Sequence, residues 1–187
     1  MIIVVGGSLG GTDALRKIIC GLPANFPVPI AVVLHRHRDS AEILAPVLQR
    51  GCDLRILEAE DKMPLEPGSV YLAPPDYQLM FDDGVVALSI DELVNFARPS
   101  IDVLFESAAE WKGREVVAIV LTGASSDGAA GAKCVQQHGG LVMVQDPASA
   151  EGAWMPNAAI AATEKPLVLS LEQIAAKLLE LTAGRVG

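Results

Sequence analysis

The sequence predicts an α/β fold: a doubly wound, mostly parallel sheet with helices on both faces and an antiparallel β-hairpin at one edge. Apolar, β-branched runs of strand length alternate with segments of helical spacing, as residues 2–5 do with residues 12–20. A glycine-rich turn over residues 6–11 joins these two segments. The same order of strand, turn and helix recurs later in the chain, which implies parallel strands connected by right-handed crossovers.

The first half of the chain repeats this unit and then changes character. Residues 30–34 predict a second buried strand, and residues 41–49 an amphipathic helix. Short apolar runs separated by turns fill residues 54–88, with the Asp-Asp-Gly of residues 82–84 as a hairpin turn. We expect these runs to form an antiparallel insertion at the sheet edge.

The second half returns to alternating helices and strands. The predicted elements are a helix over 100–111, a strand over 116–121, a helix over 128–138, a strand over 141–144 and a helix over 171–181. Residues 182–187 are expected to form a frayed tail. Since no internal repeat or long linker interrupts the chain, residues 1–187 are predicted to be a single domain.

Composition and charge exclude several classes of partner. Hydrophobic residues make up 51% of the chain, which is too many for a disordered protein. The formal net charge of -9 leaves no global basic surface for nucleic-acid phosphates or an anionic membrane. The longest apolar runs have strand length, far below the roughly 20 residues that cross a bilayer, and the N-terminus lacks a signal-peptide pattern. We therefore expect a cytoplasmic protein that binds no nucleic acid and inserts into no membrane.

Three cysteines, Cys20, Cys52 and Cys134, are widely spaced along the chain. Their odd number and spacing match neither a disulfide framework nor the close Cys-x-x-Cys pairs of a zinc site. We expect all three to be small buried hydrophobic residues. The sequence accordingly offers no site for a metal or an organic cofactor.

A serine flanked by glycines, in the pattern Gly6-x-Ser8-x-Gly10, comes after the first predicted strand. A strained strand-to-helix turn of this kind can push a serine hydroxyl outward as a nucleophile, with free helix N–H groups beside it to stabilise an oxyanion. The alternative is a phosphate-binding turn, although a dinucleotide fingerprint would need glycine at position 8 and no P-loop Lys-Ser/Thr pair is present. The motif alone leaves both a nucleophile and an anion-binding loop open.

Two further loops come after predicted strands, and ligands bind beyond the carboxyl ends of strands in a parallel sheet. His35 ends the second strand, where a base for Ser8 would have to lie. Asp127 comes after the strand at 116–121; taken alone it is typical of a helix N-cap, but beside Ser8 and His35 it is a candidate to orient the imidazole. The order Ser, His, Asp differs from the Ser, Asp, His order of α/β-hydrolases, so that fold is not assumed.

Ordered blocks through nearly the whole chain resemble a known family. They are Gly7-Ser8-Leu9-Gly10-Gly11, the strand ending in His35, Glu58-Ala59-Glu60-Asp61, Pro64-Leu65-Glu66-Pro67-Gly68, Tyr71-Leu72-Ala73-Pro74, Arg98-Pro99-Ser100-Ile101-Asp102, Leu121-Thr122-Gly123 with Asp127-Gly128, and Gln145-Asp146-Pro147 followed by Met155-Pro156. In these blocks the chain resembles the catalytic domain of the chemotaxis protein-glutamate methylesterases, the CheB family. The resemblance implies a Ser-His-Asp hydrolase that removes methyl esters from glutamyl side chains of chemoreceptors and also deamidates certain receptor glutamines.

Carried over by position, the resemblance implies that Ser8 is the nucleophile, His35 the general base and Asp127 the orienting carboxylate. We expect the backbone N–H groups of Leu9 and Ala124 to hold the oxyanion. The chain departs from the family pattern Thr-Gly-Met-Gly-Asn-Asp-Gly, because Ala124 and the two serines after it replace the Met, Gly and Asn. These changes alter the expected pocket wall and bear on substrate preference more than on the chemistry.

Three arginines, Arg36, Arg38 and Arg98, flank the proposed loops and are predicted to steer an acidic receptor surface; the alternative is ordinary surface ion pairs. By contrast, Asp13 and Asp102 are interpreted only as acids in the first turns of helices, and Ser126 as a loop hydroxyl.

The resemblance also implies partners. A methyl-accepting chemotaxis receptor is the expected substrate. The family's usual architecture places a receiver domain before the esterase, whereas this chain begins directly on the first catalytic strand. Three alternatives stay open: a domain of a longer protein that contains the receiver, a stand-alone form controlled by a partner such as a receiver domain in another chain, or a stand-alone form with no such control. Two other functions stay open: a non-catalytic module that binds a receptor or an anion in the same cleft, and an esterase that acts on a different substrate.

Overall fold

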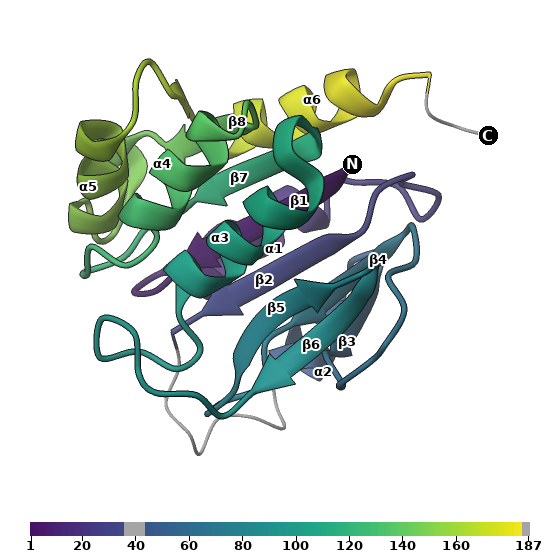
Figure 1. Cartoon of the computed structure of the whole chain (residues 1–187). Helices are drawn as coiled ribbons and strands as arrows, with labels where there is room; N and C mark the ends of the chain where they lie inside the picture. Colours follow the sequence, from purple (N-terminus) through teal and green to yellow (C-terminus); the bar gives the residue numbers. More distant parts are fainter. Residues whose placement is uncertain (36–43, 185–187) are drawn as a thin grey trace.

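Within residues 1–35 and 44–184, which the computed structural model describes, seven parallel strands form the central sheet of the protein (Figure 1). Their order is β3-β4-β2-β1-β7-β8-β9. The strands are β1 (Ile2–Gly7), β2 (Ile30–Leu34), β3 (Arg55–Glu58), β4 (Ser69–Leu72), β7 (Val116–Val120), β8 (Leu141–Gln145) and β9 (Leu167–Leu169). The chain starts at the centre of the sheet, on β1, and builds outward first on the β2 side and then on the β7 side.

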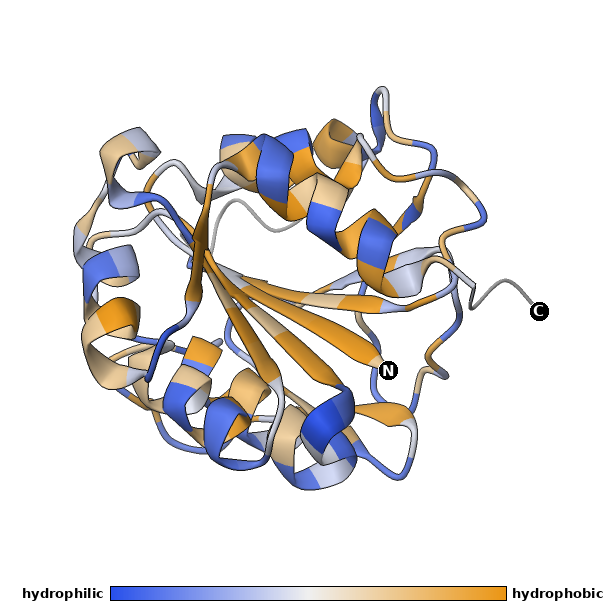
Figure 2. Ribbon diagram, turned by 90° about the horizontal axis from the view of Figure 1, so that it is seen from above, coloured by the Kyte–Doolittle hydropathy of each residue, from blue (hydrophilic) through white to orange (hydrophobic). Residues whose placement is uncertain are grey.

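Helices cover both faces of this sheet (Figure 2). They are α1 (Gly11–Ile19), α2 (Leu44–Gln49) and α6 (Leu171–Thr182) on one face, and α3 (Ile101–Lys112), α4 (Ala129–Gln137) and α5 (Trp154–Ala162) on the other. Strand β1 shows the reason, because successive side chains of a strand point to opposite faces. Its Ile3 packs in the core that contains α1, whereas Ile2 packs in the core that contains α3. The predicted α/β class is confirmed.

The antiparallel hairpin is a separate small sheet. Strands β5 (Gln78–Asp82) and β6 (Val85–Ser89) pair with each other and pack against α3. At this contact the rings of Phe81 and Trp111 lie with their centroids 5.4 Å apart. The sequence prediction was wrong for β3 and β4, which join the main sheet in parallel instead of an antiparallel insertion. Short apolar runs of this kind look alike for both directions of pairing.

The C-terminal quarter also differs from the sequence prediction. Thr182, expected in a frayed tail, is the last residue of α6; it is buried, and its hydroxyl donates to the carbonyl of Leu178 at 2.8 Å. Helix α5 was missed because Pro156 interrupts the helical pattern, although proline is tolerated in a first turn, where its missing N–H costs little. None of the helices in the described ranges is both long and apolar enough to cross a membrane.

The cysteines correct another prediction. Cys20, at the C-terminus of α1, and Cys52, after α2, form a disulfide with their Cα atoms 4.2 Å apart. The two residues lie 32 positions apart, and only the packing of their elements on the same face of the sheet brings them together. Cys134 is a free, half-buried thiol.

The topology also determines where a site can form. Strands β2 and β7 flank β1, and the chain leads from β1 to β2 on one side and from β7 to β8 on the other. In open α/β sheets the crevice for a ligand lies beyond the carboxyl ends of the strands at such a switch point. The loops after β1, β2 and β7 are the three that carry Ser8, His35 and Asp127.

Candidate active site

The turn after β1 places Ser8 at the carboxyl end of the sheet. The backbone N–H of Ser8 donates to the carbonyl of Thr122 at 2.9 Å, and the carbonyl of Ser8 accepts from the N–H of Gly11 at 2.7 Å. Gly10 lies in the left-handed region with φ 73°, and a Cβ there would approach the carboxylate of Glu151 to 2.6 Å. The turn is therefore tight, glycine-dependent and anchored to the neighbouring β7 loop.

His35 lies beside this turn because β1 and β2 are in register. Gly7 pairs with Leu34, so Ser8 and His35 each come directly after paired residues, and the N–H of His35 donates to the carbonyl of Gly7 at 3.0 Å. The imidazole is 20% exposed, and its Nε2 lies 2.7 Å from Oδ2 of Asp127. Within the described part of the chain, the Ser8 hydroxyl makes no hydrogen bond of its own, so the structure places Ser8 and His35 on neighbouring strand ends without joining them directly.

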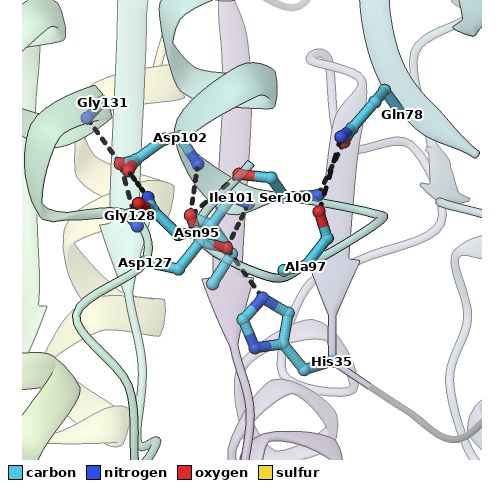
Figure 3. A network of polar contacts seen from close by, with 10 residues as sticks. All are labelled: His35, Gln78, Asn95, Ala97, Ser100, Ile101, Asp102, Asp127, Gly128 and Gly131. Carbon is cyan, nitrogen blue, oxygen red and sulfur yellow. Dashed lines mark hydrogen bonds and ion pairs between the residues drawn. The ribbon is translucent and has the colours of Figure 1, made fainter. Parts of the chain in front are cut away.

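Asp127 is buried, and four donors surround its carboxylate (Figure 3). Oδ1 accepts from the hydroxyl of Ser100 at 2.8 Å and from the N–H of Asp102 at 3.1 Å; Oδ2 accepts from the N–H of Ile101 at 2.7 Å and contacts His35. Burial by itself raises the pKa of Asp127, but the hydrogen bonds from His35, from the two backbone N–H groups and from Ser100 together bring it below its usual value. Asp127 is therefore ionised at neutral pH and oriented toward the imidazole.

The first turn of α3 was missed as part of the site. Ser100 is fully buried, its hydroxyl binds Asp127, and its own N–H donates to the Gln78 side chain at 2.8 Å. Asp102, expected to be an ordinary first-turn acid, is 3% exposed and lies against the turn that carries Asp127 (Figure 3). The Arg-Pro-Ser-Ile-Asp block noted in the sequence is the one signal that pointed to this segment.

The loop after β7 packs directly on the Ser8 turn. A Cβ at Gly123 would lie 3.0 Å from Cβ of Ser8 and 2.7 Å from the sulfur of Met155, and the hydroxyl of Thr122 donates to the carbonyl of Leu9 at 2.9 Å. Among the residues that the structure describes, the N–H groups of Leu9 and Ala124 donate to no protein acceptor. Their role in holding the oxyanion stays a prediction.

The three arginines of the prediction differ in what the structure shows. Arg98 binds its own loop and the connection before β5: its guanidinium donates to the carbonyls of Ile90 and Asp91 at 2.7 and 2.9 Å and contacts Oδ1 of Asp76 at 2.8 Å. These contacts fit the alternative of ordinary ion pairs, and the steering role of Arg98 stays a prediction. Arg36 and Arg38 lie outside the described residues.

In the described ranges, no group of three or more His, Cys, Asp or Glu side chains is arranged to hold a metal ion. The chemistry available is that of a serine hydroxyl, an imidazole and an ionised carboxylate, with two free N–H donors nearby. Such a set can hydrolyse an ester or an amide through an acyl-enzyme.

Comparisons with known proteins agree with this chemistry. A family model described as CheB methylesterase matches residues 3–178. A "Putative protein-glutamate methylesterase/protein-glutamine glutaminase" of Leptospira interrogans is 47% identical over 174 residues, which are 92% of this chain and 90% of that protein. A protein-glutamate methylesterase/protein-glutamine glutaminase of Pseudomonas putida is 38% identical over 181 residues; the match covers 96% of this chain but about half, 49%, of that relative.

A solved structure gives the same result in three dimensions. The crystal structure of the Thermotoga maritima CheB methylesterase catalytic domain superposes with a TM-score of 0.92 at 37% sequence identity. The match covers 96% of this chain and 97% of that one, so the whole sheet and its helices are shared.

Proposed function

We propose that this chain, which belongs to the CheB methylesterase family, hydrolyses methyl esters of glutamyl side chains with Ser8 as nucleophile, His35 as general base and Asp127 as orienting carboxylate. The observation that carries the proposal is the 2.7 Å contact between His35 and Asp127 beside the Ser8 turn. The names of the relatives support the substrate class, and the positions of the three residues at the strand ends support their proposed roles.

The proton route depends on the contact with Asp127. Because Asp127 is ionised, it accepts, and Nε2 of His35 must carry the hydrogen that points to it. The other ring nitrogen, Nδ1, is then unprotonated and is the base that takes the proton from the Ser8 hydroxyl. As this proton arrives, the imidazole becomes a cation, which the carboxylate of Asp127 stabilises.

The hydrolysis then proceeds in two halves. Ser8 Oγ attacks the ester carbonyl, and the N–H groups of Leu9 and Ala124 hold the oxygen that becomes negative. His35 returns the proton to the leaving methoxy group, which departs as methanol and leaves a glutamyl ester on Ser8. Water, deprotonated by His35, attacks this ester and releases the glutamate with Ser8 restored. On a glutamine side chain the same steps release ammonia in place of methanol.

The proposed substrate is a methyl-accepting chemoreceptor, in line with the chemotaxis role of the family that the sequence resembles. The decisive experiment measures methanol release from a methyl-esterified chemoreceptor fragment by the wild-type protein, Ser8→Ala, His35→Ala and the control Ser126→Ala. Ser126 is an exposed serine in the loop after β7, so its replacement tests the same chemical change outside the proposed triad.

We expect Ser8→Ala and His35→Ala each to lower turnover by about 10⁴-fold or more, as removal of a nucleophile or base does in serine hydrolases, and Ser126→Ala to retain activity. Circular dichroism is used to check that each variant is folded. A folded wild-type protein that releases no methanol from several receptor fragments, or a Ser8→Ala variant as active as wild type, contradicts the proposal.

A further inference from the structure

At the N-termini of helices α3 and α4, a carboxylate beside each helix accepts hydrogen bonds from the backbone N–H groups of the other helix. Asp127, which precedes α4, accepts the N–H groups of Ile101 and Asp102 in the first turn of α3. Asp102, in that turn of α3, accepts in return from the first turn of α4: its Oδ1 lies 2.9 Å from the N–H of Gly128 and 2.7 Å from the N–H of Gly131. Each helix therefore supplies the acid that satisfies the free N–H groups of the other.

The close approach of the two helices makes this exchange possible. A Cβ at Gly131 would lie 2.7 Å from Cβ of Phe105 and 3.0 Å from Cα of Asp102, so the backbones are in contact where the carboxylates cross. Asp102 is 3% exposed and Asp127 is 1% exposed. At this depth, a shift of one carboxylate leaves the N–H donors of the opposite helix without an acceptor.

The second oxygen of Asp102 binds a residue of the exposed loop before α3. Oδ2 accepts from the side-chain amide of Asn95 at 2.7 Å (Figure 3). Asn95 has φ 51° and lies in a surface hollow lined by Glu92, Leu93, Asn95, Phe96 and Arg98. Asp102 thus joins three segments: this loop, α3 and the α4 turn that begins beside Asp127.

We infer that Asp102 is a positioning residue for the hydrolysis: by binding Gly128, Gly131 and Asn95, it fixes the α4 turn and so holds Asp127 in line with His35. The inference rests on the proposed role of Asp127. Asp102 lies behind Asp127 and acts through it. The hydrogen-bond pattern that Asp102 completes, rather than a negative charge at this position, is what the reaction needs.

Two pairs of variants test this inference. Asp102→Ala removes all three acceptor contacts. Asp102→Asn keeps Oδ1 for the two glycine N–H groups, and its amide can still pair with Asn95 once the Asn95 amide turns over.

Asn95→Asp, at an exposed position, places a second carboxylate against Asp102. The double variant Asn95→Asp/Asp102→Asn restores one amide and one carboxylate, with their positions exchanged. The exposed first-turn acid of α1 provides the matched control, Asp13→Asn.

We expect Asp102→Ala and Asn95→Asp to lower kcat by about 10- to 100-fold with KM changed by less than about threefold, because a small displacement of a catalytic group costs rate more than binding. Asp102→Asn, the double variant and Asp13→Asn should stay within about threefold of wild type. Activities are measured below each variant's thermal midpoint, so that loss of fold is separated from loss of position.

Three kinetic outcomes overturn the inference: a wild-type kcat in folded Asp102→Ala, an Asp102→Asn variant as slow as Asp102→Ala, or a double variant no faster than Asn95→Asp. A readout without substrate separates this failure from failure of the proposed function. The ¹H NMR resonance of the His35 Nε2–H, identified by its loss in His35→Ala, should move in Asp102→Ala and Asn95→Asp and return in the double variant. An Nε2–H resonance unmoved in all variants overturns the inference even if turnover is absent.

Discussion

Asp127 and Asp102 are both buried aspartates at helix N-termini, yet their pKa values move in opposite directions. Burial raises the pKa of Asp102, and the charge of Asp127 raises it further, against the lowering effect of its hydrogen bonds. Asp127 is buried as well, but the hydrogen bonds that it accepts, led by the one from His35, outweigh burial and lower its pKa. The two neighbouring carboxylates therefore differ in pKa, and the carboxylate of Asp127, which faces the imidazole, keeps its charge.

The lowered pKa of Asp127 makes a prediction about stability at acid pH. A carboxylate whose pKa is lower in the folded than in the unfolded protein stabilises the fold above its unfolded pKa, and this stabilisation disappears as pH falls through the folded pKa. We therefore expect Asp127→Asn to be less stable than wild type at pH 7, with the gap closing as pH falls below about 4. Urea unfolding between pH 7 and pH 3 measures the gap, and a gap that widens toward acid pH would contradict this account.

At the level of single residues, the sequence was sufficient to locate side chains that come directly after strands, but it missed those whose role depends on packing. Ser8, His35 and Asp127 could be located because parallel strands bring the loops at their carboxyl ends to one edge. The role of Asp102 could not be predicted, because an acid in the first turn of a helix has the same sequence pattern whether it faces solvent or a second helix. The Cys20–Cys52 disulfide was missed for a similar reason, since their contact depends on how two distant elements pack.

Among the elements, helix α3 packs closely against the sheet at the side chain of Ile101. Ile101 is fully buried, and a Cβ added at Gly6 of β1 would overlap its side chain, while a Cβ at Gly128 would come within 2.7 Å of it. The sequence pattern places Gly6 in a nucleophile turn, and the structure gives this glycine a packing role. Because Gly6 has no side chain, the first turn of α3 reaches the end of β1. There the backbone N–H groups of this turn bind Asp127.

This contact predicts the cost of filling the space. Gly6→Ala should destabilise the protein by about 1–3 kcal/mol or more, because the added methyl group overpacks a buried site that has no room to adjust. Ile101→Ala removes the opposing atoms, so the double variant should be at least about 1 kcal/mol more stable than the sum of the single changes implies. Urea unfolding of the four proteins gives this coupling.

The control is Gly21→Ala, where the nearest atom lies 3.4 Å from the added Cβ and the glycine is exposed. It should change stability by less than about 0.5 kcal/mol. If Gly6→Ala is equally mild, or if its cost adds simply to that of Ile101→Ala, the packing between β1 and α3 does not constrain position 6 as we expect.

Element types were more predictable than their pairing. Strands buried on both faces, such as β1, β2 and β7, can be recognised as continuous apolar runs. The short strands β3 and β4 carry no signal for direction, so their parallel pairing emerged only from the folded sheet. The hairpin β5–β6 was found from its turn, yet its place against α3 depends on contacts such as Phe81 with Trp111, which no local pattern encodes.

For the whole molecule, net charge is the property that can be taken most directly from the sequence. A net charge of -9 makes the folded protein repel itself, and the exposed ion pairs that offset this, such as Arg55 with Glu66, are individually weak. We expect sodium chloride, raised from about 10 to 300 mM, to increase the thermal midpoint by about 2–4 °C, because salt screens the repulsion. Differential scanning calorimetry measures this, and a fall in the midpoint would show that attractive pairs dominate.

The hydrogen bond between His35 and Asp127 has a kinetic consequence. It joins residues 92 positions apart, and the donors that hold Asp127 come from a third segment, the start of α3. Contacts between such distant parts of a chain form late, since closing long loops costs entropy before any contact offsets it. We therefore expect helices and strand pairs to assemble before the esterase can act during refolding, and the return of turnover to follow the docking of both halves of the sheet on β1.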